Sequence, residues 1–405
     1  MPQKRSVRKK PLLSLFLVLI IGVYCCYALV RPIAPIHPMA ANLHLQSGTI
    51  SNQLVWPSQG QAALGINPSG VLATNGVQTA VPIASTAKVL TALCVLHKKP
   101  LAAHQMGPNI TLNDADVALY SNYVAENGSV TPVQSGEVLS EYQMLQAILL
   151  PSANNVADSL AIWAFGSLDN YAAYANNYVR QLGLTHTHVG TDASGYSAST
   201  VSTAHDLVLI GEAAMQEPAL ADIVGQTSAD LPVAGTVKNV NALIGVNNIV
   251  GVKTGNTDEA GGVFLAAKQA TISGHKLVIV SAVVGTRTLG EALVGSLPLL
   301  SSAEKNFATT EILPTKAIVG RYPLRWAPST SAVIPSPLTA LMWRGASVPT
   351  EVRLQPVSLG SRAGTVVGQV HIPQSPVGPA QTVPVILASD IRGPSTTWRL
   401  LHPRD

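Results

Sequence analysis

Apolar positions along this chain form one long uninterrupted run near its start and several shorter runs separated by polar and turn residues. The long run covers 11–30, twenty residues without a charge. At about 1.5 Å per residue, a helix of that length spans roughly 30 Å, the thickness of a bilayer core. Five basic residues precede it, so residues 1–10 are expected in the cytoplasm and the rest outside. The pattern predicts a transmembrane helix.

The same segment has a second interpretation as a cleaved signal peptide. Signal peptides have an apolar region of about 7–15 residues and a small-x-small cleavage site. The run here is longer, and Tyr27-Ala28-Leu29 is not such a site, which favours a retained anchor. Ala40-Ala41 is a distant cleavage candidate, and cleavage there would make the protein secreted. Residues 31–45 carry three prolines and are expected to form a linker.

Helical patterns dominate the first half of the remaining chain. Residues 84–97 are apolar almost all round, which predicts a buried helix. Residues 140–165 indicate two helices separated at Pro151. Another helix is expected within 202–223, with Ser202 or Thr203 as its cap.

Strand patterns follow. Three runs rich in Val, Ile and Leu, at 249–254, 262–268 and 276–285, are separated by turn residues and predict adjacent strands. Helices packed on an antiparallel sheet, an α+β fold, are therefore expected over 46–310. Residues 311–405 hold many prolines and short alternating runs such as 364–372 and 382–388. They predict a small all-β accessory domain.

Composition and charge narrow the function classes. The 405 residues include only 11% charged residues, and the net charge of +4 is supplied by the five basic residues among the first ten. The folded part is thus close to neutral, which argues against a nucleic-acid binder. Cys25 and Cys26 lie in the apolar run, leaving Cys94 alone, so no disulfide is expected to stabilise the exported part.

The first chemical motif is Ser85-Thr86-Ala87-Lys88, at the start of the predicted buried helix. A serine hydroxyl needs a base to become a nucleophile. Positions three apart share a helix face, and a lysine buried among apolar residues has a lowered pKa. Ser85 and Lys88 are therefore a candidate nucleophile and base. The spacing alone is weak evidence, because it recurs at Ser6, Ser273 and Ser302 and an ordinary helix cap would also explain Ser85.

Two further motifs occur once each. Ser152-Ala153-Asn154 lies between two predicted helices, where it places a hydroxyl and an amide, or simply caps a helix. Lys253-Thr254-Gly255-Asn256-Thr257 ends a predicted strand. There the lysine is a second cation, the threonine hydroxyls are donors for a carboxylate, and Gly255 lets a ligand approach the backbone. A surface turn would explain this motif equally well when it is taken alone.

The three motifs together are specific. In the order Ser-x-x-Lys, Ser-x-Asn, Lys-Thr-Gly they are typical of penicillin-binding proteins and class A β-lactamases. Over about 50–400 the chain resembles low-molecular-mass penicillin-binding proteins, which are serine-type D-alanyl-D-alanine carboxypeptidases. Stretches 81–92, 149–157, 192–195, 202–207 and 251–262 carry this resemblance. Ala87 and Ala153 stand where the family often has Thr and Gly, and the C-terminal amphipathic helix of some members is not expected here.

The resemblance implies roles for named residues. Ser85 attacks the carbonyl of the penultimate D-alanine of a peptidoglycan stem pentapeptide, with Lys88 as base and Ser152 as proton relay to the leaving D-alanine. Substrate binding falls to a second group of residues: Asn154, Lys253, Thr254, Asn256, Thr257 and Arg287. Lys253 is expected to be charged and to attract the substrate carboxylate, with help from Arg287. Backbone N–H groups of Ser85 and Asn256 would form the oxyanion hole.

The resemblance also implies partners: the stem peptide, and β-lactams as covalent inhibitors, with no metal or other cofactor. A class A β-lactamase needs a glutamate for deacylation, and residues 170–211 contain none. Endopeptidase and transpeptidase activities use the same motifs and stay open, as does a pseudoenzyme that only holds stem peptides. His186 and His188 lack the partners of a metallopeptidase site.

Overall fold

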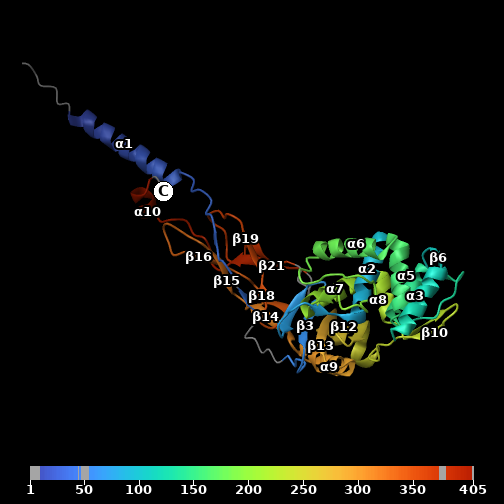
Figure 1. Cartoon of the computed structure of the whole chain (residues 1–405). Coiled ribbons are helices and arrows are strands. Elements are labelled where there is room, and N and C mark those ends of the chain that lie inside the picture. Colours follow the sequence, from blue (N-terminus) through green and yellow to red (C-terminus); the bar gives the residue numbers. More distant parts are fainter. Residues whose placement is uncertain (1–9, 44, 47–53, 374–379, 404–405) are drawn as a thin grey trace, which may run out of the picture.

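The molecule is elongated and has three parts. The computed structural model describes residues 10–43, 45–46, 54–373 and 380–403. A mixed helix-and-sheet domain lies at one end, a narrow β domain follows it, and helix α1 (Lys10–Val30) extends from the far end (Figure 1). The large domain contains most of the range 46–310, and the narrow one contains most of the range 311–405, which is called the accessory domain below.

A five-stranded antiparallel sheet forms the centre of the large domain. Its order is β11-β12-β13-β3-β4, so β11 is an edge strand. The strands are β11 (Ile249–Thr257), β12 (Gly261–Ile272), β13 (His275–Thr286), β3 (Gln61–Asn67) and β4 (Val71–Asn75). The three adjacent strands predicted from the sequence are confirmed. Strand β3 has no alternating pattern because six of its residues are buried in a row, on both faces of the sheet.

Helices cover both faces of this sheet. On one face, α7 packs on β3 and β13, and a larger helical cluster builds outward from it. That cluster consists of α2 (Ala87–Lys98), α3 (Asp114–Ala125), α4 (Glu141–Leu149), α5 (Asn154–Phe165), α6 (Leu168–Gln181), α7 (Ala204–Gln216) and α8 (Pro218–Val224). On the other face, α9 (Leu289–Lys305) packs on β12 and β13 (Figure 1). Each face has its own apolar core, so the sheet is buried on both sides.

Local sequence explains where the predicted helices begin and end. The apolar segment 84–97 forms a short 3-10 turn, η1 (Ala84–Thr86), followed by α2, whose first ten residues are buried. The break at Pro151 separates α4 from α5 as expected. Thr203 is the cap of α7, because its hydroxyl accepts a hydrogen bond from the Asp206 N–H at 3.1 Å.

Short two-stranded ladders and one further turn close the periphery of the large domain. They are β5 (Val81–Pro82) with β8 (Val201–Ser202), β6 (Asn109–Thr111) with β7 (Val138–Ser140), β9 (Ser228–Leu231) with β10 (Gly235–Lys238), and the 3-10 turn η2 (Val246–Asn248). The β5–β8 ladder brings the segment before Ser85 next to the segment that precedes α7.

The accessory domain is all-β, as predicted, apart from one short helix. A six-stranded sheet of order β1-β15-β16-β21-β20-β19 is accompanied by the pairs β14–β17 and β18–β2. The C-terminal strands are β14 (Phe307–Leu313), β15 (Ile318–Tyr322), β16 (Thr330–Val333), β17 (Leu338–Trp343), β18 (Ser347–Val348), β19 (Glu351–Leu354), β20 (Val366–Ile372) and β21 (Gln381–Leu387). A separate apolar core that includes Tyr322 and Val370 holds it together.

The segment expected as a linker belongs to the accessory domain instead. β1 (Met39–Ala40) pairs with β15, β2 (Leu45–Gln46) pairs with β18, and Ile36 forms a bridge with Val357. Three prolines make the segment look unpaired in sequence. Proline is nevertheless tolerated at sheet edges, where one side of the strand needs no partner. Residues that precede the large domain in the sequence therefore belong to the accessory domain.

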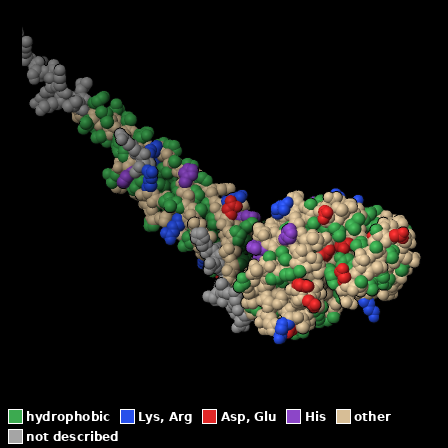
Figure 2. Space-filling view, in the orientation of Figure 1, with side chains coloured by type: hydrophobic (Ala, Val, Ile, Leu, Met, Phe, Trp, Pro, Cys, Tyr) green, Lys and Arg blue, Asp and Glu red, His purple; other side chains and the backbone are tan. Residues whose placement is uncertain are grey.

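The apolar segment 11–30 lies within helix α1. Its described side chains are mostly exposed, among them Leu15, Phe16 and Val18. Hydrophobic side chains also cover much of the helix in Figure 2. Among the residues that the structure describes, no helix combines the length and hydropathy needed to cross a membrane. The proposed cytoplasmic tail lies almost wholly outside the described residues.

A short C-terminal helix, α10 (Thr396–Leu401), packs against the last turn of α1 (Figure 1). Arg399 donates hydrogen bonds to the carbonyl oxygens of Leu29 at 2.8 Å and Arg31 at 3.0 Å, and the Tyr24 hydroxyl donates to the Leu400 carbonyl. This six-residue helix was not predicted from the sequence, because so short a segment gives too weak a pattern.

Candidate active site

Ser85 lies in the 3-10 turn that leads into α2. Ser85 lies two residues before the start of the buried helix, and its side chain is only half-buried while Thr86 and Ala87 are buried. The Thr86 hydroxyl donates to the Ile83 carbonyl at 2.6 Å and fixes the turn. Ser85 is therefore held at the rim of a packed core, reachable by a substrate.

Lys88 is fully buried and points at Ser85. Its Nζ donates to Ser85 Oγ at 2.9 Å, to Asn154 Oδ1 at 2.7 Å and to the Ser194 carbonyl at 2.9 Å. Burial lowers the pKa of Lys88 to about 7, although the charges of Asp192 and Asp158 act in the opposite direction. At neutral pH a substantial fraction of Lys88 is thus neutral and can accept the Ser85 proton.

The second motif lies at the start of α5. Asn154 is the first residue of α5, and its backbone N–H donates to the Ser129 carbonyl at 2.7 Å. Its side chain reaches Lys88 across the helical cluster. The next residue, Asn155, fixes the neighbouring loop through two hydrogen bonds with the Thr131 backbone. The start of α5 is thus tied both to the loop before it and to the candidate base.

Ser152 lies in the turn between α4 and α5. It is buried and has a backbone φ of +69°, a left-handed conformation that L-residues rarely adopt. Such strain is common where a side chain must face a particular direction at a functional site. The role of the Ser152 hydroxyl as a proton relay stays a prediction.

The third motif lies on the edge strand β11, which runs alongside η1. A Cβ added to Gly255 would lie 2.9 Å from the Ile83 carbonyl oxygen and 3.2 Å from the Ser85 nitrogen. Glycine is therefore required there for the close approach of the strand to the Ser85 turn. The motif is not a free surface turn, and it reaches the nucleophile through its backbone.

Lys253 and Thr254 are both buried on β11. Lys253 Nζ donates to the Thr254 carbonyl at 3.1 Å. Burial, and next the charge of Lys88, hold the pKa of Lys253 well below its usual value. The predicted charge on this lysine stays a prediction: burial opposes it, and an incoming carboxylate would stabilise the ammonium.

Asn256 and Thr257 end the strand. Asn256 is exposed and follows the close contact between Gly255 and Ser85. The Thr257 hydroxyl accepts a hydrogen bond from the Ala260 N–H at 3.1 Å, within the turn that joins β11 to β12. Thr257 therefore stabilises this turn, and the predicted substrate-binding roles of Asn256 and Thr257 stay predictions.

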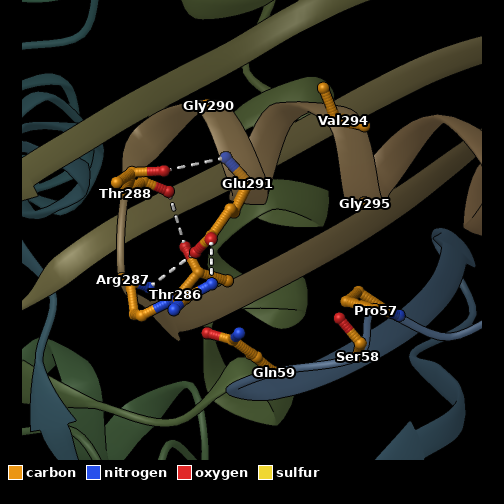
Figure 3. Close-up of a pocket in the computed structure, with 10 residues that line it drawn as sticks. All are labelled: Pro57, Ser58, Gln59, Thr286, Arg287, Thr288, Gly290, Glu291, Val294 and Gly295. Carbon is orange, nitrogen blue, oxygen red and sulfur yellow. Dashed lines mark hydrogen bonds and ion pairs between the residues drawn. The ribbon is translucent and has the colours of Figure 1, made fainter.

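Arg287 is not brought to this group of residues by any described contact. Its side chain is 74% exposed and forms an ion pair with Glu291 at 2.8 Å. Figure 3 shows the two residues facing one another in a surface pocket between α9 and the segment before β3. Its predicted role in carboxylate binding stays a prediction.

Sequence reasoning missed a layer of residues behind Lys88. The Ser194 carbonyl is one of the three partners of Lys88 Nζ, and the carboxylates of Asp158 and Asp192 influence its charge. Asp192 and Ser194 fall within the stretch 192–195 that carried the resemblance, but no role was assigned to them. Asp158 follows Asn154 by four positions on α5, so it shares its helix face.

The histidine pair considered as a metal site has other contacts. His186 donates through its backbone N–H to Asp206 Oδ2 at 2.9 Å, and His188 bridges to Val201. In the part of the chain that the structure describes, no group of three or more His, Cys, Asp or Glu residues could hold a metal ion.

This combination of an α+β fold, a buried lysine on a serine and a lysine-bearing edge strand defines a serine enzyme of the penicillin-binding class. The sequence profile of the D-alanyl-D-alanine carboxypeptidase family, peptidase S11, matches residues 58–288. The chain belongs to this family and is a serine-type D-alanyl-D-alanine carboxypeptidase.

Individual relatives agree with that assignment. The chain is 34% identical over 229 residues to D-alanyl-D-alanine carboxypeptidase DacB2 of Mycobacterium tuberculosis, a match that covers 55% of this chain and 74% of the relative. It is 29% identical to a D-alanyl-D-alanine endopeptidase of Pseudomonas aeruginosa, covering 60% and 76%. The fold is similar to that of penicillin binding protein 5 from Haemophilus influenzae, with a TM-score of 0.58, 20% identity and coverage of 85% and 100%.

Proposed function

We propose that this carboxypeptidase removes the terminal D-alanine from peptidoglycan stem pentapeptides through an acyl-enzyme on Ser85. The observation that carries the proposal is the 2.9 Å hydrogen bond between Lys88 Nζ and Ser85 Oγ, made by a lysine whose pKa burial lowers to about 7. A nucleophile within hydrogen-bond reach of a base that titrates near neutrality is the arrangement that acyl transfer needs.

In the first step, neutral Lys88 takes the proton of Ser85 as the serine oxygen bonds to the carbonyl carbon of the penultimate D-alanine. Negative charge then develops on the carbonyl oxygen. The backbone N–H groups of Ser85 and Asn256 are the proposed donors to it, and such donors contribute about 3 kcal/mol each. The approach of Gly255 to the Ser85 nitrogen supports this assignment.

In the second step, the peptide C–N bond breaks and the terminal D-alanine leaves as an amine. Ser152 is the proposed relay that passes a proton to this amine, and its buried position in the turn before α5, which carries Asn154, supports this role. Asn154 orients Lys88 and bonds the substrate amide. Water then cleaves the ester on Ser85 and restores the free enzyme.

Lys253 and Thr254 are proposed to hold the carboxylate of the terminal D-alanine. The energy of burying a lysine is offset when an anion binds next to it, because the charged form is then paired. Carboxylate binding would therefore raise the pKa of Lys253 and favour its charged form. This coupling makes a buried lysine compatible with recognition of an anionic substrate.

β-Lactams are the proposed covalent inhibitors, since they acylate the same serine. Residues 170–211 contain no glutamate that could activate a deacylating water in the manner of a class A β-lactamase. A long-lived penicilloyl adduct is therefore expected. One of the relatives is a D-alanyl-D-alanine endopeptidase, so endopeptidase activity is a second candidate. The two activities differ in the group that leaves when the peptide bond is cleaved.

The activity is tested on purified residues 31–403, which retain the strands β1 and β2 of the accessory domain. Fluorescent penicillin and intact mass should show one covalent adduct, and a pentapeptide ending in D-Ala-D-Ala should release D-alanine. Ser85→Ala should abolish both. Ser273→Ala is the matched control, because it removes the serine of another Ser-x-x-Lys motif in an exposed turn. A well-folded protein without adduct or release would favour a pseudoenzyme that only holds stem peptides.

We also propose attachment to the cell membrane through residues 11–30, with the catalytic domain on the extracytoplasmic side. The exposed apolar side chains of α1 and the basic residues before it support this proposal. Fractionation of cells that produce the full chain tests it. Recovery in the membrane fraction after a high-salt wash is expected, whereas release of a shortened protein into the medium would indicate cleavage near Ala40-Ala41.

A further inference from the structure

A second layer of polar residues lies directly behind Lys88. It consists of the carboxylates of Asp158 and Asp192, both almost fully buried, and the hydroxyl of Tyr123. Buried carboxylates are uncommon unless they are well hydrogen-bonded, because burial disfavours their charge. None of the catalytic steps described above uses these side chains, so their presence calls for an explanation.

Asp158 connects three elements around the base. Its Oδ1 accepts a hydrogen bond from the Ala193 N–H at 2.8 Å, and its Oδ2 accepts one from the Tyr123 hydroxyl at 2.7 Å. Ala193 immediately precedes Ser194, whose carbonyl accepts the hydrogen bond from Lys88. Asp158 thus fixes the Ala193–Ser194 backbone, and this backbone in turn binds the amine of Lys88.

Asp192 fixes the same segment from its other side. Its Oδ1 accepts hydrogen bonds from the Ser194 N–H and hydroxyl at 2.8 and 2.6 Å, and its Oδ2 accepts one from the Ser197 N–H at 3.0 Å. The segment is also pressed against the nucleophile turn: a Cβ on Gly195 would lie 2.2 Å from the Ala84 carbonyl oxygen. A shift here would be transmitted to both the Ser85 turn and Lys88.

We propose that Asp158, held by Tyr123, is a positioning residue for the Lys88 base: it fixes the Ala193–Ser194 backbone and supplies a negative charge that favours protonated Lys88. This proposal rests on the function of Lys88 proposed above. The groups that face Lys88 are Ser85, Asn154 and Asp158, Asp192 and the Ser194 carbonyl, and Lys253. Of these charged groups, Asp158 is the one on the helix that also carries Asn154.

The pKa of Asp158 lies close to that of Lys88. Burial raises its pKa to about 6, while the hydrogen bonds from Tyr123 and Ala193 act in the opposite direction. Both carboxylates, Asp158 and Asp192, line a pocket of about 280 Å³, together with Tyr123, Glu126 and other residues. Protons can therefore exchange with Asp158 through this pocket, and the apparent pKa values of the Asp158–Lys88 pair belong to a coupled system.

The test is the pH profile of penicillin acylation by the full chain, purified in detergent. Asp158→Asn keeps an oxygen for the Ala193 N–H and removes the charge. The acid limb of the profile should move to lower pH, with the largest rise in acylation rate between about pH 6 and pH 7, where Asp158 is charged and Lys88 is partly protonated. Tyr123→Phe removes the donor that stabilises the Asp158 charge, and it should shift the limb in the same direction by less.

Glu126→Gln is the matched control, because it removes a carboxylate from the same pocket without touching the segment 193–194. Its acid limb should coincide with that of the unaltered protein. A lower plateau with an unmoved limb in both Asp158→Asn and Tyr123→Phe would reduce Asp158 to a packing role and overturn the proposal. If Asp158→Asn does not fold, the profile of Tyr123→Phe decides. Absence of acylation in the unaltered protein would instead contradict the proposed function.

Discussion

Lys88 and Asn154, separated by 66 positions in the chain, are joined by a 2.7 Å hydrogen bond from Nζ to Oδ1 inside the helical cluster. The bond connects the start of α2 with the start of α5. It holds the lysine in the direction of Ser85, whose Oγ lies 2.9 Å from Nζ. The orientation of the base thus depends on how two helices pack rather than on the motif around Ser85 alone.

Removing this bond should slow acylation. Asn154→Ala leaves Lys88 with Ser85 and the Ser194 carbonyl as partners and opens space next to a buried amine. A hydrogen bond to a charged group contributes about 1.5–3 kcal/mol, which corresponds to a loss of roughly 10- to 100-fold in rate. Stopped-flow measurement of penicillin acylation checks this, with the melting temperature as control for folding. An unchanged rate would contradict a role for Asn154 in orienting the base.

Acylation should depend on pH through Lys88. Only neutral Lys88 accepts the Ser85 proton, and its pKa is lowered to about 7. The rate should therefore rise as pH increases through about 7 and level off above it, and each unit below should lower it about tenfold. An acylation profile between about pH 5 and pH 9 measures this directly. A limb centred near the ordinary lysine pKa would show that burial does not set the proton affinity of the base.

The spacing between β11 and the Ser85 turn should tolerate no side chain at position 255. In Gly255→Ala, the new Cβ would lie 2.9 Å from the Ile83 carbonyl oxygen, so the strand or the turn must shift. Displacement of an oxyanion donor costs about 3 kcal/mol, or roughly a hundredfold in rate. Gly290→Ala is the control, because its nearest neighbour would be 3.8 Å away. Equal acylation rates for the two variants would exclude the crowding.

The sequence predicted the residues proposed to carry the reaction better than the residues that hold them in position. Ser85, Lys88 and Asn154 were found because motifs place them at helix starts, and the strands β11 to β13 because their apolar runs are long. Asp158 and the Ser194 carbonyl were not, because their roles depend on contacts between helix α5 and a distant loop. Backbone groups such as that carbonyl carry no residue-type signal at all.

Two strands of the accessory domain were also not predicted from the sequence, for a different reason. Its edge strands β1 and β2 come from the segment 31–46, far from the other strands in sequence. Their two-residue lengths and the neighbouring prolines leave no period to recognise. Pairing of distant short segments is decided by the sheet that they join, and a local pattern cannot predict it.

Arg287 offers a test of whether a residue outside the described contacts of the site assists binding. Its guanidinium is exposed and paired with Glu291, and exposed ion pairs of this kind contribute little to stability because solvent screens them. Arg287→Ala should therefore leave the melting temperature nearly unchanged. If the arginine stays with Glu291 during binding, the apparent affinity for the pentapeptide should also be unchanged.

A rise of roughly tenfold or more in KM, with kcat preserved, would instead show that Arg287 leaves Glu291 to bind the substrate carboxylate. Glu291→Gln separates the two cases further: by freeing Arg287 it should lower KM only if the arginine reaches the substrate.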